Sequence, residues 1–314
     1  MDLSSSLRSL ARTALERTSL LDPLRDGRHY AAQLRQRTFP PLTKLRLELA
    51  TTPEVGRAVR ALRRDGIVIL HGHVAGERLA RIRASFAAAM DEIDREPPGE
   101  ELPHPPPAKS TYRVREFNRE AQITYNFEPF ASIPELLDVA LDETVAAIVA
   151  RYYGRDDFLL HHVAATRYHP LEPREFSAFQ WHHDECGKHT NVIFLLSDVT
   201  ERDQYMTYLK GSHRLLHSRE RTANSRFTRE EVELLYPHLE QLRCTAEAGS
   251  VMIFDSNGLH RGNRSLGAPR DNLACNFNFG YMTYPIRVPR AAARGLSSAQ
   301  KALLERNQLV RYED

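Results

Sequence analysis

The segment Arg270-Asp-Asn-Leu-Ala-Cys-Asn-Phe-Asn-Phe279 decides the fold class of this 314-residue chain, because polar and apolar side chains alternate along it. Successive side chains of a β-strand point to opposite faces of the sheet. One face of this strand would carry arginine and asparagines, and the other leucine, cysteine and phenylalanines. The alternation predicts a strand with one face in an apolar core. The other face lines a polar cavity or forms the outer surface.

Short runs of β-forming residues lie on the amino-terminal side of this strand, and turn residues separate them. We expect strands over residues 158–168, 179–183, 191–196, 204–209 and 250–254, in addition to the alternating strand itself over 272–281. Strands at this spacing, without regular alternation with helices, indicate an antiparallel barrel or jelly roll. The predicted fold class is therefore mainly β with flanking helices.

Helical patterns dominate the first half of the chain. A helix is expected to open at Thr52-Pro53 and end at Gly66, before a short buried strand over residues 67–70. Apolar residues at helical spacing predict an amphipathic helix over 79–93, and a further helix is expected over 134–153. Capping boxes begin two more helices, at Thr228 and at Ser297. A proline-rich loop is expected over 97–109.

These elements predict an organisation with one main domain. Residues 1–55 would form a helical extension, broken at Phe39-Pro40-Pro41, and residues 56–314 a single domain. Within that domain, helices of 56–154 would pack on a jelly-roll core of 155–285, followed by a carboxy-terminal helix over 296–310.

Composition excludes several classes of protein. Apolar residues make up 41% and charged residues 27% of the chain, as in ordinary globular proteins. The net charge of +2 is dispersed, which argues against a nucleic-acid partner. The longest apolar run, 145–150, is far shorter than the roughly 18 residues of a membrane helix, and arginines interrupt any signal peptide. We therefore expect a cytoplasmic protein without a membrane partner, and the oligomeric state stays open.

The segment Phe179-Gln-Trp-His-His-Asp184 carries a possible metal motif. His182 and Asp184 are two residues apart and would share one side of a strand. His260, after the strand at 250–254, is the best candidate for a third ligand. Two histidines and one carboxylate form the facial triad of non-haem Fe(II) oxygenases. With 14 histidines in the chain, the motif alone is weak, and the alternative is a set of polar residues without metal.

Arg270 strengthens the metal interpretation. It follows His260 by ten residues and begins the alternating strand. A guanidinium binds a carboxylate through two parallel hydrogen bonds. An oxygenase that uses 2-oxoglutarate needs such a group to hold the far carboxylate of this co-substrate. Arg264 is the nearest competing arginine.

Together these motifs resemble the phytanoyl-CoA dioxygenase-like family of Fe(II)/2-oxoglutarate-dependent oxygenases. The similarity covers residues 55–285. It rests on the segments Arg64–Leu70, Trp181–Asp184, Leu196–Val199, Lys210–Arg214 and Gly249–Val251, followed by the distal His260 and Arg270. Lys210 stands where the family pattern has proline.

The resemblance implies a double-stranded β-helix, a cupin-like jelly-roll barrel. It also implies that His182, Asp184 and His260 are catalytic iron ligands and that Arg270 binds 2-oxoglutarate. Our polar candidates for further co-substrate contacts are Asn191, Thr166 and Asn276. The cofactors would be Fe(II), 2-oxoglutarate and O2, with ascorbate only as an assay additive. The partner would be a small-molecule substrate, hydroxylated or otherwise oxidised in metabolite or natural-product tailoring, with release of succinate and CO2.

Two alternatives remain open from the residues. One is a zinc-dependent hydrolase or isomerase on a cupin-like barrel, which could use the same three ligands. The other is a non-catalytic binding module of the same fold. The carboxylate of Asp184 argues against halogenation. His183 and His213 are expected to be structural, Cys186 a buried small side chain, and Tyr125 and Asn126 part of a lid or of a surface loop.

Overall fold

The computed structural model describes most of the second half of the chain and parts of the first. The described residues are 23–37, 52–95, 115–118, 121–173, 179–184, 189–218, 221–222, 224–279, 285–307 and 309–314. The break at Phe39-Pro40-Pro41, the loop 97–109 and Cys186 lie outside them. Among the described helices, none combines the length and the apolar character needed to cross a bilayer.

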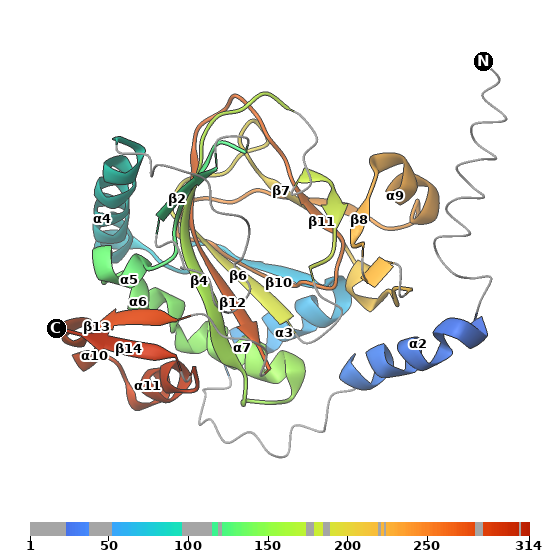
Figure 1. The fold of residues 1–314 in the computed structure, drawn as a ribbon, viewed down its shortest axis with the longest axis horizontal. Coiled ribbons are helices and arrows are strands. Elements are labelled where there is room, and N and C mark those ends of the chain that lie inside the picture. Colours follow the sequence, from blue (N-terminus) through green and yellow to red (C-terminus); the bar gives the residue numbers. More distant parts are fainter. Residues whose placement is uncertain are drawn as a thin grey trace.

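Two antiparallel sheets form the centre of the described structure (Figure 1). The larger sheet has the order β1 (Ile67–Leu70), β10 (Val251–Asp255), β6 (His189–Leu195), β12 (Arg270–Asn278), β4 (Leu159–Tyr168), β3 (Ile123–Asn126) and β2 (Arg115–Asn118). The smaller sheet has the order β8 (Arg226–Phe227), β5 (Trp181–His182), β11 (His260–Gly262), β7 (Met206–Leu209) and β9 (Gln241–Cys244).

The chain passes repeatedly between the two sheets, as in a jelly roll. It runs from β4 in the larger sheet to β5 in the smaller one, back to β6, and across again to β7. After β9 it returns through β10, β11 and β12 in the same alternating way. The predicted double-stranded β-helix is therefore confirmed, with flanking helices as expected.

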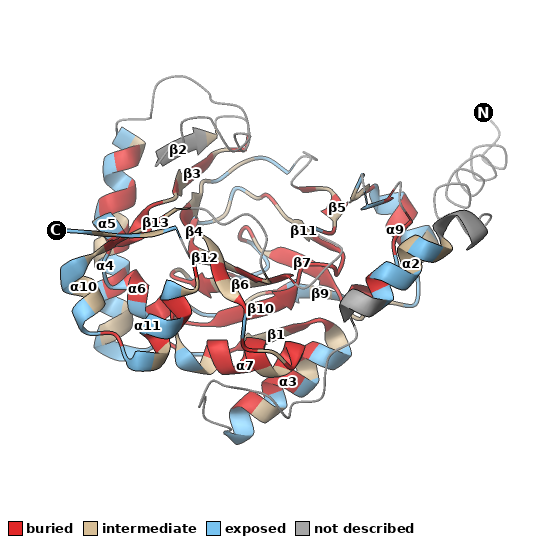
Figure 2. Ribbon diagram, turned by 60° about the horizontal axis from the view of Figure 1, so that its bottom comes forward, coloured by how far each residue is buried: buried red, intermediate tan, exposed pale blue. Residues whose placement is uncertain are grey.

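The two faces of the larger sheet have different partners. Val192, Phe194, Leu273, Cys275 and Phe277 point outward and are buried in the main apolar core with the helices. α3 (Pro53–Asp65) and α7 (Glu143–Tyr153) belong to this helical layer and lie next to each other (Figure 2). On β12 the opposite face carries Arg270, Asn272 and Asn276, so the polar row faces the smaller sheet. The polar row therefore lies on the inner side of the sheet, with Arg270 and Asn272 buried, and the outer-surface interpretation of the alternating strand is wrong.

α4 (Gly76–Arg95) covers the predicted amphipathic helix and buries Ile82, Phe86, Met90 and Ile93. The helix that opens at Thr52 ends at Gly66, as expected, and the Thr52 hydroxyl accepts a hydrogen bond from the Val55 amide. The two capping boxes begin α9 (Arg229–Leu235) and α11 (Ser298–Glu305). α2 (Pro23–Arg37) lies within the expected helical extension, whose boundary near residue 55 stays a prediction.

Three sequence predictions differ from the structure. The single helix over 134–153 is replaced by α5 (Pro129–Ser132), α6 (Leu136–Ala140) and α7, because Asp142 caps a new helix through its side chain. The carboxy-terminal helix is shorter than 296–310. It follows α10 (Arg290–Arg294), and β14 (Val310–Glu313) pairs with β13 (Ile286–Pro289). Tyr125 and Asn126 form neither lid nor loop, since they belong to β3 of the larger sheet.

Candidate metal centre

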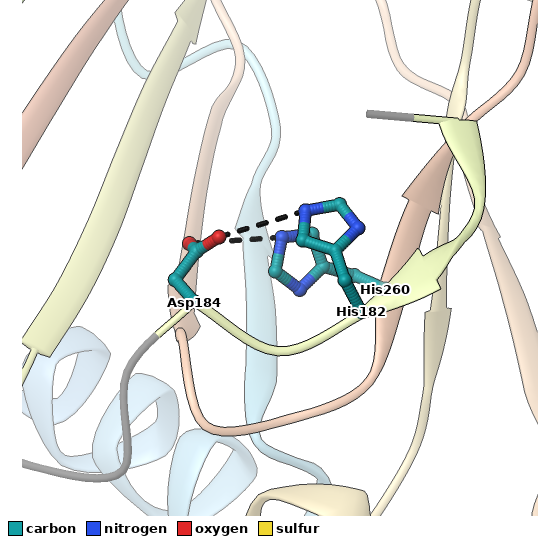
Figure 3. Close-up of side chains that lie close together, drawn as sticks. All are labelled: His182, Asp184 and His260. Carbon is teal, nitrogen blue, oxygen red and sulfur yellow. Dashed lines mark ion pairs between the residues drawn. The ribbon is translucent and has the colours of Figure 1, made fainter. Parts of the chain in front are cut away.

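His182, Asp184 and His260 come together at one end of the smaller sheet (Figure 3). His182 ends β5, Asp184 lies just beyond it, and His260 begins β11, directly opposite His182. One nitrogen or oxygen atom from each residue lies within 4.8 Å of the others. The Asp184 carboxylate is 3.5 Å from His182 Nε2 through Oδ1 and 3.7 Å from His260 Nε2 through Oδ2. The two histidines and the carboxylate that the sequence singled out are therefore neighbours.

Hydrogen bonds to backbone carbonyls fix both imidazole rings and leave each Nε2 available to bind a metal ion. Nδ1 of His182 lies 2.9 Å from the Gln180 carbonyl, and Nδ1 of His260 lies 2.9 Å from the Gly258 carbonyl. A carbonyl oxygen can only accept, so each Nδ1 must carry the proton. In the neutral ring each Nε2 then has a free lone pair, and both Nε2 atoms lie on the side of the carboxylate. Metal-bound histidines are generally held in this way. The donor set fits a divalent transition metal.

The electrostatic surroundings keep His182 and Asp184 in their ligating forms. Burial, together with the neighbouring His260, lowers the pKa of His182 to about 3, so its ring is neutral at physiological pH. Burial of the Asp184 carboxyl opposes ionisation, but His260, His182 and a hydrogen bond outweigh it and lower the pKa of this group. A neutral imidazole and an ionised carboxylate are the forms that bind metal.

Asn191 and Asn276 lie beside Asp184 and connect it to a histidine cluster. Nδ2 of Asn191 donates to Asp184 Oδ2 at 2.7 Å, and Asn276 donates to the Asn191 side-chain oxygen. Asn276 also lies 3.1 Å from His189 Nε2, and His162 donates to its oxygen at 3.4 Å. Both asparagines thus orient a carboxylate of the triad, and their contact with 2-oxoglutarate stays a prediction.

Arg270 occupies the other end of the same face of β12. Its side chain is only 5% exposed, and Nη1 donates to the Gln204 carbonyl at 2.7 Å. The guanidinium lies 3.9 Å from the centre of the Tyr168 ring, and its Nε has no hydrogen-bond partner in the described structure. No described carboxylate pairs with this buried cation, an arrangement that is costly unless an anion binds there.

Thr166 is the last predicted co-substrate contact, and it lies next to Arg270. Asn272, two residues beyond Arg270 on the same face, donates to the Thr166 hydroxyl. Thr166 and Asn272 are directly opposite each other on β4 and β12. Sequence reasoning placed Asn272 on the polar row but not among the site residues. It missed Gln204, because a backbone carbonyl acceptor leaves no signal in the sequence.

The other polar candidates have structural surroundings. Arg264 donates to the carbonyls of Ala121 and His169, both at 2.7 Å, and so joins the β3 region to the end of β4. His183 is 1% exposed and faces away from Asp184, with Nε2 donating to the Arg221 carbonyl. His213 lies 3.3 Å from the Arg63 carbonyl. The structural interpretation of both histidines agrees with these contacts.

The comparisons with known proteins agree with this architecture. Residues 62–270, well over half of the chain, match the model of the phytanoyl-CoA dioxygenase (PhyH) family. A search of curated proteins found no match.

Solved structures with the same fold include EctD from S. alaskensis with bound Fe, at 19% identity and a TM-score of 0.57, covering 77% of this chain and 88% of that one. The non-heme alpha ketoglutarate dependent carbocyclase SnoK from nogalamycin biosynthesis has 18% identity and a TM-score of 0.50, with coverage of 76% and 86%. AviO1 from Streptomyces viridochromogenes Tue57 has the same identity and TM-score, with coverage of 76% and 100%.

Proposed function

We propose that this chain, which belongs to the phytanoyl-CoA dioxygenase family, is an Fe(II)- and 2-oxoglutarate-dependent oxygenase that acts on a small molecule. The observation that carries the proposal is the triad His182, Asp184 and His260, with both Nδ1 atoms held by backbone carbonyls and both Nε2 atoms directed at one carboxylate. Three protein ligands on one side of an iron ion would leave three positions for the co-substrate and O2.

The residues of the chain would divide the work between the two sheets. The smaller sheet would hold iron through the triad. Arg270 on the larger sheet would bind the far carboxylate of 2-oxoglutarate through two hydrogen bonds, with the Tyr168 ring holding the guanidinium in place. Thr166 and Asn272 would supply polar contacts beside it. When bound, iron, 2-oxoglutarate and O2 supply the oxidising chemistry, with succinate and CO2 as products.

We infer hydroxylation of an unactivated C–H bond as the reaction. With three protein ligands and a co-substrate bound through two atoms, an iron ion would have one position left for O2. Chloride would then have no position while Asp184 is a ligand. SnoK, which has the same fold, is named a carbocyclase, so the fold alone does not fix the reaction. We propose a role in tailoring a metabolite or natural product.

Anaerobic spectroscopy tests the assignment. Addition of Fe(II) and 2-oxoglutarate should give a visible charge-transfer band, whereas Zn(II) with 2-oxoglutarate should give none. The Asp184→Ala variant should lose the band and retain the circular dichroism of the fold. On admission of O2, succinate should form slowly without substrate. A zinc hydrolase would show neither band nor succinate, and that result would reject the proposal.

A further inference from the structure

Arg226 continues a row of side chains that contains two of the proposed metal ligands. In the smaller sheet Arg226 is directly opposite His182, and His182 is directly opposite His260. Directly opposed residues of antiparallel strands project from the same face, with Cβ atoms roughly 5 Å apart. Phe227 and Trp181, the adjacent pair, project from the other face into an apolar cluster. The side chain of Arg226 therefore lies beside His182 on the metal side of the sheet.

The charge of Arg226 has no partner in the described structure. Its Nη1 is buried and makes no hydrogen bond. Burial lowers the pKa of the Arg226 guanidinium, and the attraction of the Asp184 carboxylate opposes this shift. Asp184 is close enough to attract the Arg226 guanidinium, but the two side chains form no ion pair. The carboxylate is directed instead at the two histidines and at Asn191.

A second arginine in the same region, Arg221, has the carboxylate partner that Arg226 lacks, although its Nε also makes no hydrogen bond in the described structure. Arg221 pairs with Glu231 at 2.8 Å, and both side chains are less than a tenth exposed. It also donates to the Arg226 carbonyl at 2.7 Å and lies over the Phe227 ring. Arg221 therefore holds β8 in place. The backbone of Arg226 is fixed by these contacts while its guanidinium has no oxyanion.

A partly desolvated cation without an oxyanion is an unfavourable arrangement for folding alone. A guanidinium presents a planar set of donors that matches a carboxylate or phosphate group. Arg226 lies on the smaller sheet beside the triad, whereas Arg270 lies on the larger sheet at the opposite end of the polar row. The two sheets thus carry two arginines, Arg226 and Arg270, that pair with no described carboxylate, and one co-substrate accounts for only one of them.

We propose that Arg226 binds an oxyanion group of the substrate, a carboxylate or a phosphate, and so holds the neighbouring C–H bond at the metal. This inference rests on the proposed function, because it assigns Arg270 to 2-oxoglutarate. It predicts that the substrate is an organic acid or a phosphorylated small molecule.

Calorimetric titration of simple anions tests the inference without knowledge of the substrate. Propionate and inorganic phosphate are titrated separately into the anaerobic Fe(II)–2-oxoglutarate complex of the full chain. Variants Arg226→Gln and Arg226→Lys are compared with Arg243→Gln, which removes an exposed arginine of the same sheet that pairs with Glu201. The charge-transfer band reports binding of iron and 2-oxoglutarate in every variant.

We expect one of the two anions to bind the unmutated protein and Arg243→Gln equally. Its affinity should fall about tenfold or more in Arg226→Gln and less in Arg226→Lys, which keeps the charge but loses the planar donors. The anion affected identifies the group as carboxylate or phosphate. The band should persist in all variants.

Two results would overturn the inference while leaving the proposed function intact. One is an unchanged anion affinity in Arg226→Gln, or the absence of binding by either anion to the unmutated complex. The other is loss of 2-oxoglutarate binding in Arg226→Gln, which would make Arg226 the co-substrate anchor. Absence of the band in the unmutated protein would instead reject the proposed function, and this inference with it.

Discussion

His182 and His183 are chemically identical neighbours in the chain, but strand alternation gives them opposite surroundings. His182 faces Asp184 and His260, with its Nδ1 held by a carbonyl. The His183 ring lies on the other side, with its centre 3.9 Å from that of His217. Sequence alternation was sufficient to predict this difference, because it depends only on the direction of two adjacent side chains.

Replacing each histidine by glutamine should separate the two roles. His182→Gln removes a metal ligand and should lower Fe(II) affinity by a factor of about 100 or more. His183→Gln should bind one equivalent of Fe(II) and lose about 1–3 kcal/mol of stability, because a buried hydrogen bond is disturbed. Metal titration and urea denaturation measure the two effects. Equal loss of iron in both variants would mean that the strand register is shifted by one residue.

Arg270 and Arg264 form a second informative pair. Arg270→Gln should weaken 2-oxoglutarate binding roughly 30-fold or more, because a buried cation that pairs with the co-substrate is lost, and it should leave iron binding unchanged. Arg264→Gln should instead lower the unfolding temperature, since this side chain donates to the carbonyls of Ala121 and His169. Anaerobic titration of 2-oxoglutarate decides between them. Loss of affinity confined to Arg264→Gln would identify Arg264 as the anchor.

At the scale of whole elements, prediction succeeded where the signal is local. Most predicted strands of the core differ from the observed ones by no more than two residues at either end, and α4 extends its predicted helix in both directions. The prediction of a single helix over 134–153 was wrong. Apolar residues lie on both sides of Asp142 and suggested one continuous helix, but the Asp142 side chain caps the start of α7 and so separates it from α6. A periodicity argument does not detect such a break.

Contacts between distant segments could not be predicted. Arg226 lies opposite His182 through a two-residue strand, and nothing in the pattern of residues around Phe227 indicates that pairing. The parallel pair of β13 and β14 likewise joins segments on either side of α11. The triad was predictable because two of its members are two residues apart in sequence. The row to which Arg226 belongs was not, because it depends on strand order.

Gly249 tests the fit between the turn before β10 and the loop before α4. Its φ of +86° is unfavourable for other residues, and a Cβ atom there would lie 1.9 Å from the Val74 carbonyl oxygen. Gly72 has a φ of +57° but would place its Cβ 3.8 Å from the nearest atom, in Glu247. Gly249→Ala should therefore lower the free energy of unfolding by about 3 kcal/mol or more, and Gly72→Ala by only about 1–2 kcal/mol. Urea denaturation of both variants gives the comparison, and equal costs would show that the close approach is unimportant.

At the scale of the whole molecule, the candidate site depends on how the two sheets are held together. The triad belongs to the smaller sheet and Arg270 to the larger one. Beside His260, an apolar cluster that includes Phe254 of the larger sheet and Tyr208 of the smaller one fills the space between them. The Phe254 ring centre is 5.0 Å from that of His260. This cluster fixes the distance between metal ligands and anion anchor, so substitutions in it would affect both functions.

Buried neutral histidines should make the stability of the metal-free protein depend on pH. Burial lowers the pKa of both His161 and His162 to about 4, well below the ordinary value of about 6.5. Between these values the unfolded chain takes up protons that the folded chain does not, so stability should fall as pH decreases from 6.5 toward 4. Each such histidine adds a slope of up to about 1.4 kcal/mol per pH unit.

His73 should act in the opposite direction, because its hydrogen bond with Asp142 raises its pKa in the folded state. Its contribution is present below pH 6.5 and is lost as pH rises through the raised value. His182, whose pKa is also lowered, acts in the same direction as His161 and His162, so the net effect should be lower stability at pH 5 than at pH 7. Urea denaturation of the chelated protein at both values measures it. His162→Asn should reduce the difference and His73→Asn should increase it. A difference unchanged by His162→Asn would show that this ring is protonated in the folded protein and that its burial has no influence on acid stability.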